Sequence, residues 1–262
     1  MVVALVTGGT SGIGAEFARQ FATRGYDLVL VARDVVRLDD MASELRGLGV
    51  QVEILQADLA DRSDVDVVAA RLEDASRPIE VLVNNAGFGI HTPLTAKNVS
   101  EHDRGFDVMC RAVLVLSGAA ARGMRDRGHG RIVNISSVAG QLAMGSYSTV
   151  KSWVTTFSES LSVELRGTGV TVTAVLPGWV RTEFHQRAGI RASSIPNSLW
   201  LSPEQLVSIA LRDVEKGKVL SIPTVRYQAV FWMLRHAPKG AVRSVSASIS
   251  SSRKQPSVTE GS

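Results

Sequence analysis

A tyrosine and a lysine stand four residues apart in the stretch SYSTVK, Tyr147 and Lys151, in a chain with only three tyrosines. On an α-helix this spacing places both side chains on one face. A free tyrosine has a pKa of about 10, too high for easy proton transfer at neutral pH, and a nearby cation lowers it. The pair could therefore be a general acid or base with its tuning cation. The alternative is one polar stripe of an ordinary helix, and the surrounding sequence must decide.

A glycine-rich stretch, VTGGTSGIG, has glycines at positions 8, 12 and 14 and lies between the first expected strand and the first expected helix. Glycines allow a tight turn and let a pyrophosphate approach the N–H groups of a helix N-terminus, where the helix dipole favours negative charge. The spacing is G-x-x-x-G-x-G rather than G-x-G-x-x-G. The stretch predicts a phosphate-binding loop, with a glycine-rich turn that binds nothing as the alternative.

Short aliphatic runs alternate with amphipathic stretches, which is typical of repeated βαβ units with right-handed crossovers. The expected strands are residues 2–7, 27–32, 50–57, 79–84, 131–136 and 170–176. We therefore predict an α/β fold, a Rossmann-type doubly wound parallel sheet in three α/β/α layers. From Pro177 to about Pro203 the pattern breaks up, and a substrate lid is expected there before a helix at 202–218.

The composition limits the other possibilities. The 262 residues, 45% of them apolar, suffice for one sizeable core, and we expect a single domain over 1–243 with a flexible serine-rich tail at 244–262. The lone Cys110 excludes an internal disulfide, and the five histidines show no metal-ligand spacing. We see neither a signal peptide nor a membrane span, so we expect a cytoplasmic protein without a metal. The net charge of +4 argues against nucleic acid and suits an anionic ligand.

Six short motifs occur in a fixed order, and together they are far more specific than any one alone. They are TGGTSGIG (7–14), ADL (57–59), NNAG (84–87), NISS (134–137), YSTVK (147–151) and PGWVRT (177–182). With them the chain resembles the classical short-chain dehydrogenase/reductase (SDR) family over roughly residues 1–222. The resemblance implies that Tyr147 and Lys151 are the catalytic pair and that the protein is a homodimer or homotetramer.

By matching position, the resemblance also implies a set of cofactor-binding residues along the cleft. These are Gly8, Thr10, Ser11, Gly12, Ile13 and Gly14 for the pyrophosphate and ribose, Asp58 and Leu59 beside the adenine, Asn85, Ala86 and Gly87 on the cleft floor, and Pro177, Gly178, Val180 and Thr182 beside the nicotinamide, with Tyr147 and Lys151 touching the cofactor as well.

The end of the second strand, VLVARD, is expected to select the cofactor. An acidic residue there binds a ribose 2′-hydroxyl, whereas an arginine pairs with a 2′-phosphate. Arg33 therefore favours NADP(H) over NAD(H). The adjacent Asp34 could blunt this preference, and a merely solvated arginine is the alternative.

The matched Ser137 implies a hydrogen-bond donor for the substrate oxygen, with Ser136 as the alternative if the register slips by one. Lys151 and an oxidised nicotinamide ring both favour the phenolate of Tyr147, which would be the acid in carbonyl reduction and the base in alcohol oxidation. Two departures from the family occur. The loop QLAMGS is short, and Met109 replaces an asparagine that helps hold a water beside the lysine in the family.

The C-terminal third loosely resembles bacterial ketoacyl reductase-like members. Phe184, Leu199, Trp200 and Leu201 could form an apolar lid for an acyl chain, or simply pack in the core. Residues 225–243 combine apolar residues with arginine and lysine, which suits a basic amphipathic helix on a membrane surface. A subunit contact or a cover for the substrate cleft explains the segment as well.

The predicted function is an NADP(H)-dependent oxidoreductase that interconverts a ketone or aldehyde and an alcohol, on a hydrophobic acyl or lipid-like substrate in lipid metabolism. A steroid- or polyketide-type carbonyl reductase is the alternative within the enzymes. A cofactor-binding regulator with little turnover is the alternative outside them, because Met109 breaks the family pattern.

Overall fold

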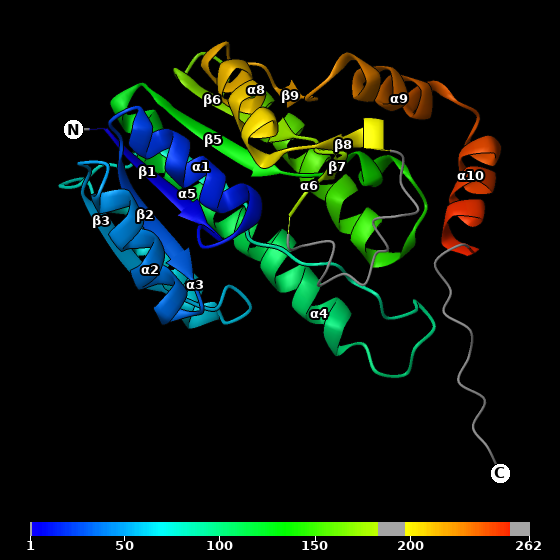
Figure 1. The fold of residues 1–262 in the computed structure, drawn as a ribbon, viewed down its shortest axis with the longest axis horizontal. Helices are drawn as coiled ribbons and strands as arrows, with labels where there is room; N and C mark the ends of the chain where they lie inside the picture. The colour runs from blue at the N-terminus through cyan, green and yellow to red at the C-terminus, as the bar shows by residue number, and fades with distance from the viewer. Residues whose placement is uncertain (1, 183–196, 252–262) are drawn as a thin grey trace.

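The computed structural model of the protein describes residues 2–182 and 197–251. Its centre is a seven-stranded parallel sheet in the order β3-β2-β1-β4-β5-β6-β9 (Figure 1). The strands are β1 (Val3–Thr7), β2 (Asp27–Ala32), β3 (Val52–Gln56), β4 (Val81–Asn84), β5 (Gly130–Ile135), β6 (Val170–Val175) and β9 (Leu220–Ser221). The six predicted strands are confirmed to within two residues at each end. Sequence periodicity missed β9, because two residues carry too little pattern.

Helices cover both faces of the sheet, as the aliphatic character of the strands requires. The helices of the main body are α1 (Gly12–Thr23), α2 (Val35–Arg46), α3 (Arg62–Glu73), α4 (Ser100–Phe106), α5 (Ala112–Arg127), α6 (Gly145–Glu164) and α8 (Pro203–Glu215). One buried cluster joins α1, α2 and α8 to the sheet, and a second joins α3, α5 and α6 to its other face. The predicted Rossmann-type three-layer fold is confirmed.

The strand order reverses between β1 and β4, and in open parallel sheets ligands bind at the carboxyl ends of the strands beside such a point. The loops after β1 and β4 are the segments 8–11 and 85–87 of the predicted phosphate loop and cleft floor. The fold therefore brings these two motifs together at one crevice.

The C-terminal segment forms two helices where the sequence suggested one basic helix followed by a weakly ordered tail. They are α9 (Val225–His236) and α10 (Lys239–Ser251), and in Figure 1 both lie at the margin of the molecule, beyond the sheet. The break falls at Ala237, whose extended ψ of 146° is the conformation that a following proline favours.

The expectation of weak order from about Ser244 differs from the helix that runs to Ser251. Serine hydroxyls support this helix: Ser246 donates to the carbonyl of Val242 at 2.8 Å and accepts from the N–H of Ala143 at 3.0 Å. The second bond holds α10 against the short loop before α6. The rest of the predicted tail, 252–262, lies outside the described residues.

Within the described residues, no helix combines the length and hydrophobicity needed to cross a bilayer. The same part of the chain contains no group of three or more histidine, cysteine or acidic side chains arranged as a metal site.

Candidate active site and cofactor cleft

The predicted phosphate loop is a tight turn that only glycine fits at several points. Gly8 and Gly12 have φ angles of 64° and 54°, in the left-handed region. A Cβ on Gly14 would lie 2.2 Å from the carbonyl oxygen of Gly8. Ser11 is the N-cap residue of α1, yet its side chain makes no capping bond. The N–H groups at the start of α1 are thus left to another acceptor, so the loop fits the pyrophosphate of a dinucleotide.

The floor of the cleft is held to the phosphate loop by hydrogen bonds. The hydroxyl of Thr7 accepts from the backbone N–H groups of Asn85 and Ala86, at 2.9 and 3.1 Å. The Asn85 amide donates to the carbonyls of Thr7 and Gly8, at 3.0 and 3.2 Å. These bonds fix the spacing between the ends of β1 and β4, so Asn85 acts here as a brace between two predicted cofactor-binding loops.

Arg33 lies exposed at the end of β2, where the sequence predicts the 2′-phosphate. The Asp34 carboxylate accepts the N–H of Arg37 at 3.1 Å as the N-cap of α2, so it faces the helix rather than a ribose. Arg37 in turn donates to the carbonyl of Thr10 in the phosphate loop, at 3.5 Å. Arg37 is a second cation at the adenosine end that the sequence analysis missed. In the sequence it stands four residues after Arg33, just inside the helix that follows β2.

The predicted adenine-binding pair, Asp58 and Leu59, lies in the loop after β3. Leu59 is buried at 6% exposure. Asp58 pairs with Arg104 on α4 at 2.8 Å, and its pKa is lowered because the Arg104 and Ala60 hydrogen bonds and the charges of Arg104 and Arg33 outweigh the opposing effect of burial. Asp58 therefore stays ionised and joins the loop after β3 to the last turn of α4.

Ser137, Tyr147 and Lys151 come together beside the end of β5. Ser137 is the N-cap of a 3₁₀ turn, η2 (Val138–Gln141), and its hydroxyl accepts from the N–H of Ala139 at 3.1 Å. Tyr147 and Lys151 lie on the first turns of α6, with the Lys151 Nζ 5.8 Å from the Tyr147 ring centroid. Ser137 also hydrogen-bonds Tyr147. The geometry unites the three predicted catalytic side chains.

Ser136, the alternative to Ser137, makes its hydrogen bonds inside the core. Ser136 is buried at 2% exposure, and its hydroxyl donates to the carbonyl of Lys151 at 2.6 Å and bonds the hydroxyl of Thr155 at 2.7 Å. Its hydroxyl therefore fixes α6 against β5. Ser137, one residue further on, is the serine that reaches Tyr147.

The pKa of Tyr147 differs from the prediction. Burial raises it to about 12, and the hydrogen bond from Ser137 offsets only part of this effect. The Lys151 ammonium is itself buried and donates to the carbonyl of Ile135 at 2.8 Å, and burial of the phenol outweighs its attraction for the phenolate. Burial lowers the pKa of Lys151 to about 8, although the nearby Cys110 raises it slightly. Tyr147 is therefore a protonated phenol at neutral pH.

Met109 occupies the position of the family asparagine, on a π-helical turn, η1 (Asp107–Arg111), between α4 and α5. The side chain is 1% exposed. A Cβ built on Gly87 would lie 3.0 Å from the Met109 sulfur and 3.7 Å from the Lys151 ammonium, so the thioether sits beside the cleft floor and the lysine. A thioether is at best a weak acceptor, and it cannot donate.

The predicted nicotinamide side of the cleft begins at Pro177, whose carbonyl accepts the Ser137 hydroxyl at 3.4 Å. Val180 is buried in β7 (Trp179–Val180), and the Thr182 side chain lies close enough to Gly12 that a Cβ there would approach it to 3.3 Å. Thr182 thus closes the cleft across the phosphate loop. Gly178 packs against Tyr227 of α9, where a Cβ would lie 2.0 Å from the ring.

Tyr227 ties this loop to the end of the predicted lid. Its hydroxyl accepts from the N–H of Trp179 at 2.9 Å and donates to the carbonyl of Leu199 at 2.5 Å. Leu199 ends the 3₁₀ turn η4 (Asn197–Leu199) and leads into β8 (Trp200–Leu201), which pairs with β7. Sequence reasoning missed this anchor, because nothing in the stretch VRYQAV marks a tyrosine that bonds a loop 48 residues away.

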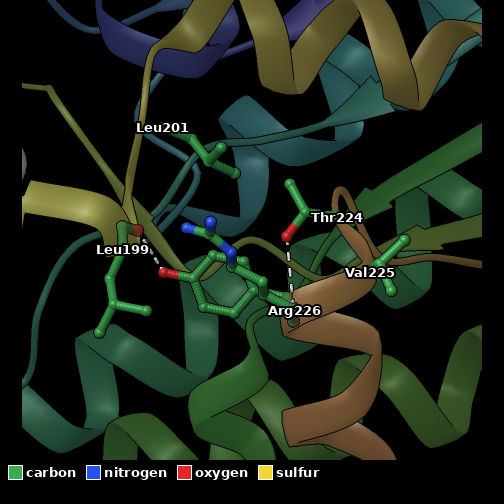
Figure 2. Close-up of a pocket in the computed structure, with 6 residues that line it drawn as sticks. Leu199, Leu201, Thr224, Val225 and Arg226 are labelled. Atoms are coloured by element: carbon green, nitrogen blue, oxygen red, sulfur yellow. Dashed lines mark hydrogen bonds between the residues drawn. The ribbon is translucent and has the colours of Figure 1, made fainter.

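A pocket of about 300 Å³ lies beside this anchor. Figure 2 shows Leu199 and Leu201 on one side of the pocket and Thr224, Val225 and Arg226 at the start of α9. Two of the four predicted lid residues therefore line a pocket. Trp200 instead packs against Trp179, with ring centroids 6.0 Å apart, and Phe184 lies outside the described residues.

A buried polar network lies behind the site. Asn84 donates to Asn134 at 2.9 Å across the paired strands β4 and β5, and to Ser117 on α5 at 3.0 Å. Asn134 donates to Ser158 on α6 at 2.9 Å. The asparagines of NNAG and NISS thereby lock the strand ends that carry the cleft floor and Ser137.

The parallel sheet and the glycine turn at its switch point between β1 and β4 are those of a Rossmann-type dinucleotide-binding protein. Residues 2–191 match the family model of short chain dehydrogenase. The chain belongs to the short-chain dehydrogenase/reductase family, as its six motifs predicted.

Curated relatives support the same family. The NADP-dependent 3-hydroxy acid dehydrogenase YdfG of Shigella flexneri is 31% identical over 215 residues, which cover 78% of this chain and 86% of that protein. The very-long-chain 3-oxoacyl-CoA reductase of Anas platyrhynchos is 35% identical over 190 residues, 69% of this chain and 60% of the relative. The match to glycine betaine reductase ATRR of Emericella nidulans, 35% identical over 185 residues and 70% of this chain, spans 15% of that protein.

Two solved structures resemble the whole chain. A short-chain dehydrogenase from Sphingobium yanoikuyae in complex with NADPH has a TM-score of 0.83 and 36% identity, and covers 99% of both chains. The bulky-bulky ketone specific alcohol dehydrogenase from Comamonas testosteroni has a TM-score of 0.79 and 32% identity, and covers 100% of this chain and 97% of the other. The similarity therefore includes the C-terminal third.

Proposed function

We propose that the protein is an NADP(H)-dependent oxidoreductase that interconverts a ketone or aldehyde and an alcohol on a hydrophobic acyl or lipid-like substrate. The observation that carries the proposal is the convergence of Ser137, Tyr147 and Lys151 beside the cofactor cleft. These residue types supply a hydrogen-bond donor, a proton donor and a cation at one point, which is what carbonyl reduction needs.

Each of the three side chains has a separate task in the proposed reaction. Bound NADPH would supply a hydride to the carbonyl carbon. Ser137 donates a hydrogen bond to the carbonyl oxygen and stabilises the negative charge that develops there. Tyr147 transfers its phenolic proton to that oxygen, so the alcohol leaves a tyrosinate behind. The Lys151 ammonium stabilises this tyrosinate until it regains a proton.

The pKa values favour reduction at neutral pH. Tyr147, with a pKa of about 12, holds its proton before the reaction. Lys151, with a pKa of about 8, is mostly protonated at pH 7 and loses its charge in mild alkali. The cation that stabilises the tyrosinate is therefore present at neutral pH and decreases above pH 8.

The preference for NADP(H) rests on the cations at the adenosine end. Arg33 follows β2 and Arg37 lies in the first turn of α2, and Asp34 caps that helix instead of facing the ribose. A dianionic 2′-phosphate suits two guanidinium groups. An NADP-dependent relative and a neighbour solved with NADPH support the same choice.

The hydrophobic substrate rests on similarity and on the apolar pocket. One relative is a 3-hydroxy acid dehydrogenase, another is a 3-oxoacyl-CoA reductase, and a structural neighbour is specific for bulky ketones. Leu199 and Leu201 give the pocket an apolar wall. A 3-oxoacyl group fits these features, and a steroid- or polyketide-type ketone is the competing substrate. The cytoplasmic location and the assembly into a homodimer or homotetramer remain predictions from the sequence.

A second candidate function is a cofactor-binding regulator with little turnover. The observation that favours it is the Met109 thioether beside Lys151, where the family asparagine holds a water. The intact Ser137, Tyr147 and Lys151 cluster favours the enzyme instead.

Turnover with a ketone panel separates the two functions. NADPH oxidation is followed with 3-oxoacyl thioesters of short and long chain and with ketosteroids, while NADPH affinity is measured by titration on the same preparation. We expect turnover to increase with acyl length. We expect Tyr147→Phe to abolish turnover without changing NADPH affinity. NADPH binding without turnover on any substrate would favour the regulator.

A further inference from the structure

Helix α9 is apolar on two opposite faces, which an ordinary surface helix is not. One face packs inward: Tyr227 and Phe231 are 7% and 6% exposed and belong to the buried cluster that contains Leu176. Val230 and Leu234 flank this buried face. The inner face accounts for the attachment of α9 to the domain and leaves its outer face unexplained.

The outer face exposes large apolar side chains. Val225, Trp232 and Met233 are 79%, 65% and 56% exposed, and Ala229 and His236 lie on the same side. The spacing 225, 229, 232, 236 follows one stripe of an α-helix. Trp232 stacks on His236 with ring centroids 4.7 Å apart, so the stripe ends in two adjacent rings.

Positive charge borders this stripe. At 100° per residue, Arg226 and Arg235 fall on its two edges. Arg235 lies 5.8 Å from the Phe231 ring centroid and also pairs with Glu159 at 3.5 Å, so part of its charge is balanced within the protein. Lys239 and Arg243 are exposed on α10, which follows directly. The arginines of α9 thus flank the apolar stripe, and two further exposed cations lie on the next helix.

The charge of the whole chain divides at the same place. Residues 216–259 contain eight lysines and arginines and no aspartate or glutamate, whereas residues 1–215 contain 21 lysines and arginines against 24 acidic residues. A net acidic body with a basic end segment is typical of a protein that meets an anionic surface through that end.

We propose that the outer face of α9, with the exposed cations of α10, is a docking surface for an anionic phospholipid membrane. The apolar side chains of the stripe suit the apolar interior of a bilayer, and a tryptophan suits the interface between the interior and the headgroups. The arginines and lysines suit the lipid phosphates. A nucleic acid would match the cations but not the solvent-exposed valine and methionine. A second copy of the chain would match the cations through its net acidic body, and the light-scattering test below distinguishes that outcome.

Docking there would orient the candidate site. The inner face of α9 carries Tyr227, which hydrogen-bonds both Trp179 in β7 and Leu199 at the end of the predicted lid. The proposed membrane surface and the lid anchor are therefore two sides of one helix. The membrane proposal does not depend on the proposed reaction.

Vesicle co-sedimentation tests the proposal with the full chain. Vesicles of phosphatidylcholine with and without 30–40% phosphatidylglycerol, roughly the anionic content that attracts basic segments, are mixed with protein at low and at physiological salt. We expect binding to the anionic vesicles only, weakened by salt. The double variants Trp232→Ser/Met233→Ser and Lys239→Glu/Arg243→Glu should each reduce the partition coefficient about tenfold or more.

Matched controls lie far from α9. Val36→Ser removes an exposed valine on α2, 65% exposed, and Arg62→Glu reverses an exposed arginine on α3. Both should bind vesicles like the parent, and all variants should keep the parent's circular dichroism and NADPH affinity. Equal loss in the controls would overturn the proposal, as would no binding by the parent at low salt.

Two further outcomes would replace membrane docking with another partner. If light scattering shows that Trp232→Ser/Met233→Ser halves the mass of the particle, the stripe is a contact between copies. If neither the parent nor Trp232→Ser/Met233→Ser binds vesicles, and both bind a DNA oligonucleotide equally well, the basic segment binds nucleic acid. Either result would overturn the membrane proposal.

Discussion

Adjacent serines in NISS have different environments, and the difference comes from one strand end. Ser136 still alternates with the buried side of β5, so its hydroxyl bonds the carbonyl of Lys151 inside the core. Ser137 begins a 3₁₀ turn and faces Tyr147. A shift of register by one residue would exchange the two, which is why the sequence alone left both open.

The adenosine end gives a residue-scale prediction about cofactor choice. Arg33→Asp should lower NADPH affinity and raise NADH affinity, because a carboxylate repels the 2′-phosphate and accepts a 2′-hydroxyl. A charge-assisted hydrogen bond contributes about 1.5–3 kcal/mol, which corresponds to about one to two decades in dissociation constant. Arg37→Ala should weaken NADPH binding without improving NADH. Titrations of both cofactors test this, with Arg62→Ala as control. Unchanged affinities in both variants would show that these arginines only face solvent.

Met109 gives a second residue-scale prediction. An asparagine there would restore a group that both donates and accepts beside Lys151, and so a route for the proton that Tyr147 must regain. We expect Met109→Asn to raise the rate of reduction and to shrink its solvent isotope effect. Met109→Leu, which keeps an apolar side chain of similar volume, should leave both near the parent values. If Asn and Leu behave alike, the proton already travels by another path; a fall with Asn alone would show that the site needs the apolar side chain.

At the scale of elements, α9 acts as a brace whose inner face holds the segment 177–182, which is predicted to line the nicotinamide. Tyr227→Phe removes the hydroxyl that bonds Trp179 and Leu199 and leaves two backbone groups without it, at a cost of about 1–3 kcal/mol in stability. We expect the KM for NADPH to rise several-fold while kcat stays near the parent, because the hydroxyl positions the loop and touches no reacting atom. Tyr26→Phe is the matched control. A large fall in kcat with unchanged KM would contradict a positioning role.

The sheet and its motifs were predictable because their signals are local. A strand such as 27–32 is a run of aliphatic residues, and the first glycine turn follows its strand directly. The Tyr227 anchor, the Arg104 to Asp58 pair and β9 depend on chain segments that meet only after folding. No pattern of period 2 or 3.6 encodes such pairings, so the residues that brace the site were the part that sequence analysis missed.

The pKa prediction failed for a related reason. Spacing placed Lys151 beside Tyr147 correctly, yet the sign of the Tyr147 shift depends on how much solvent the fold removes from both groups. Burial disfavours the phenolate and the ammonium alike, so it raises the tyrosine pKa and lowers the lysine pKa. A single sequence shows which groups are neighbours and not how deeply they are buried.

For the whole molecule, the buried Lys151 makes folding stability depend on pH. Its pKa is about 8 in the folded protein and 10.5 in the unfolded chain, so between these values the unfolded state binds more protons and stability rises with pH. Below pH 8 both states are charged and the full burial cost of the ammonium is present. From pH 7 to 9.5 the gain from this one group amounts to about 2 kcal/mol.

The test compares urea unfolding of the parent and of Lys151→Met at pH 7 and pH 9.5. The contributions of groups common to both proteins largely cancel in the difference. One of these groups is Cys110, whose pKa burial raises to about 11, so that its contribution to stability falls with pH where that of Lys151 rises. We expect the parent to gain about 2 kcal/mol relative to the variant between the two pH values. A difference near zero would mean that the Lys151 ammonium keeps its ordinary pKa in the fold, and the fall in the tyrosinate-stabilising charge proposed above pH 8 would then not occur.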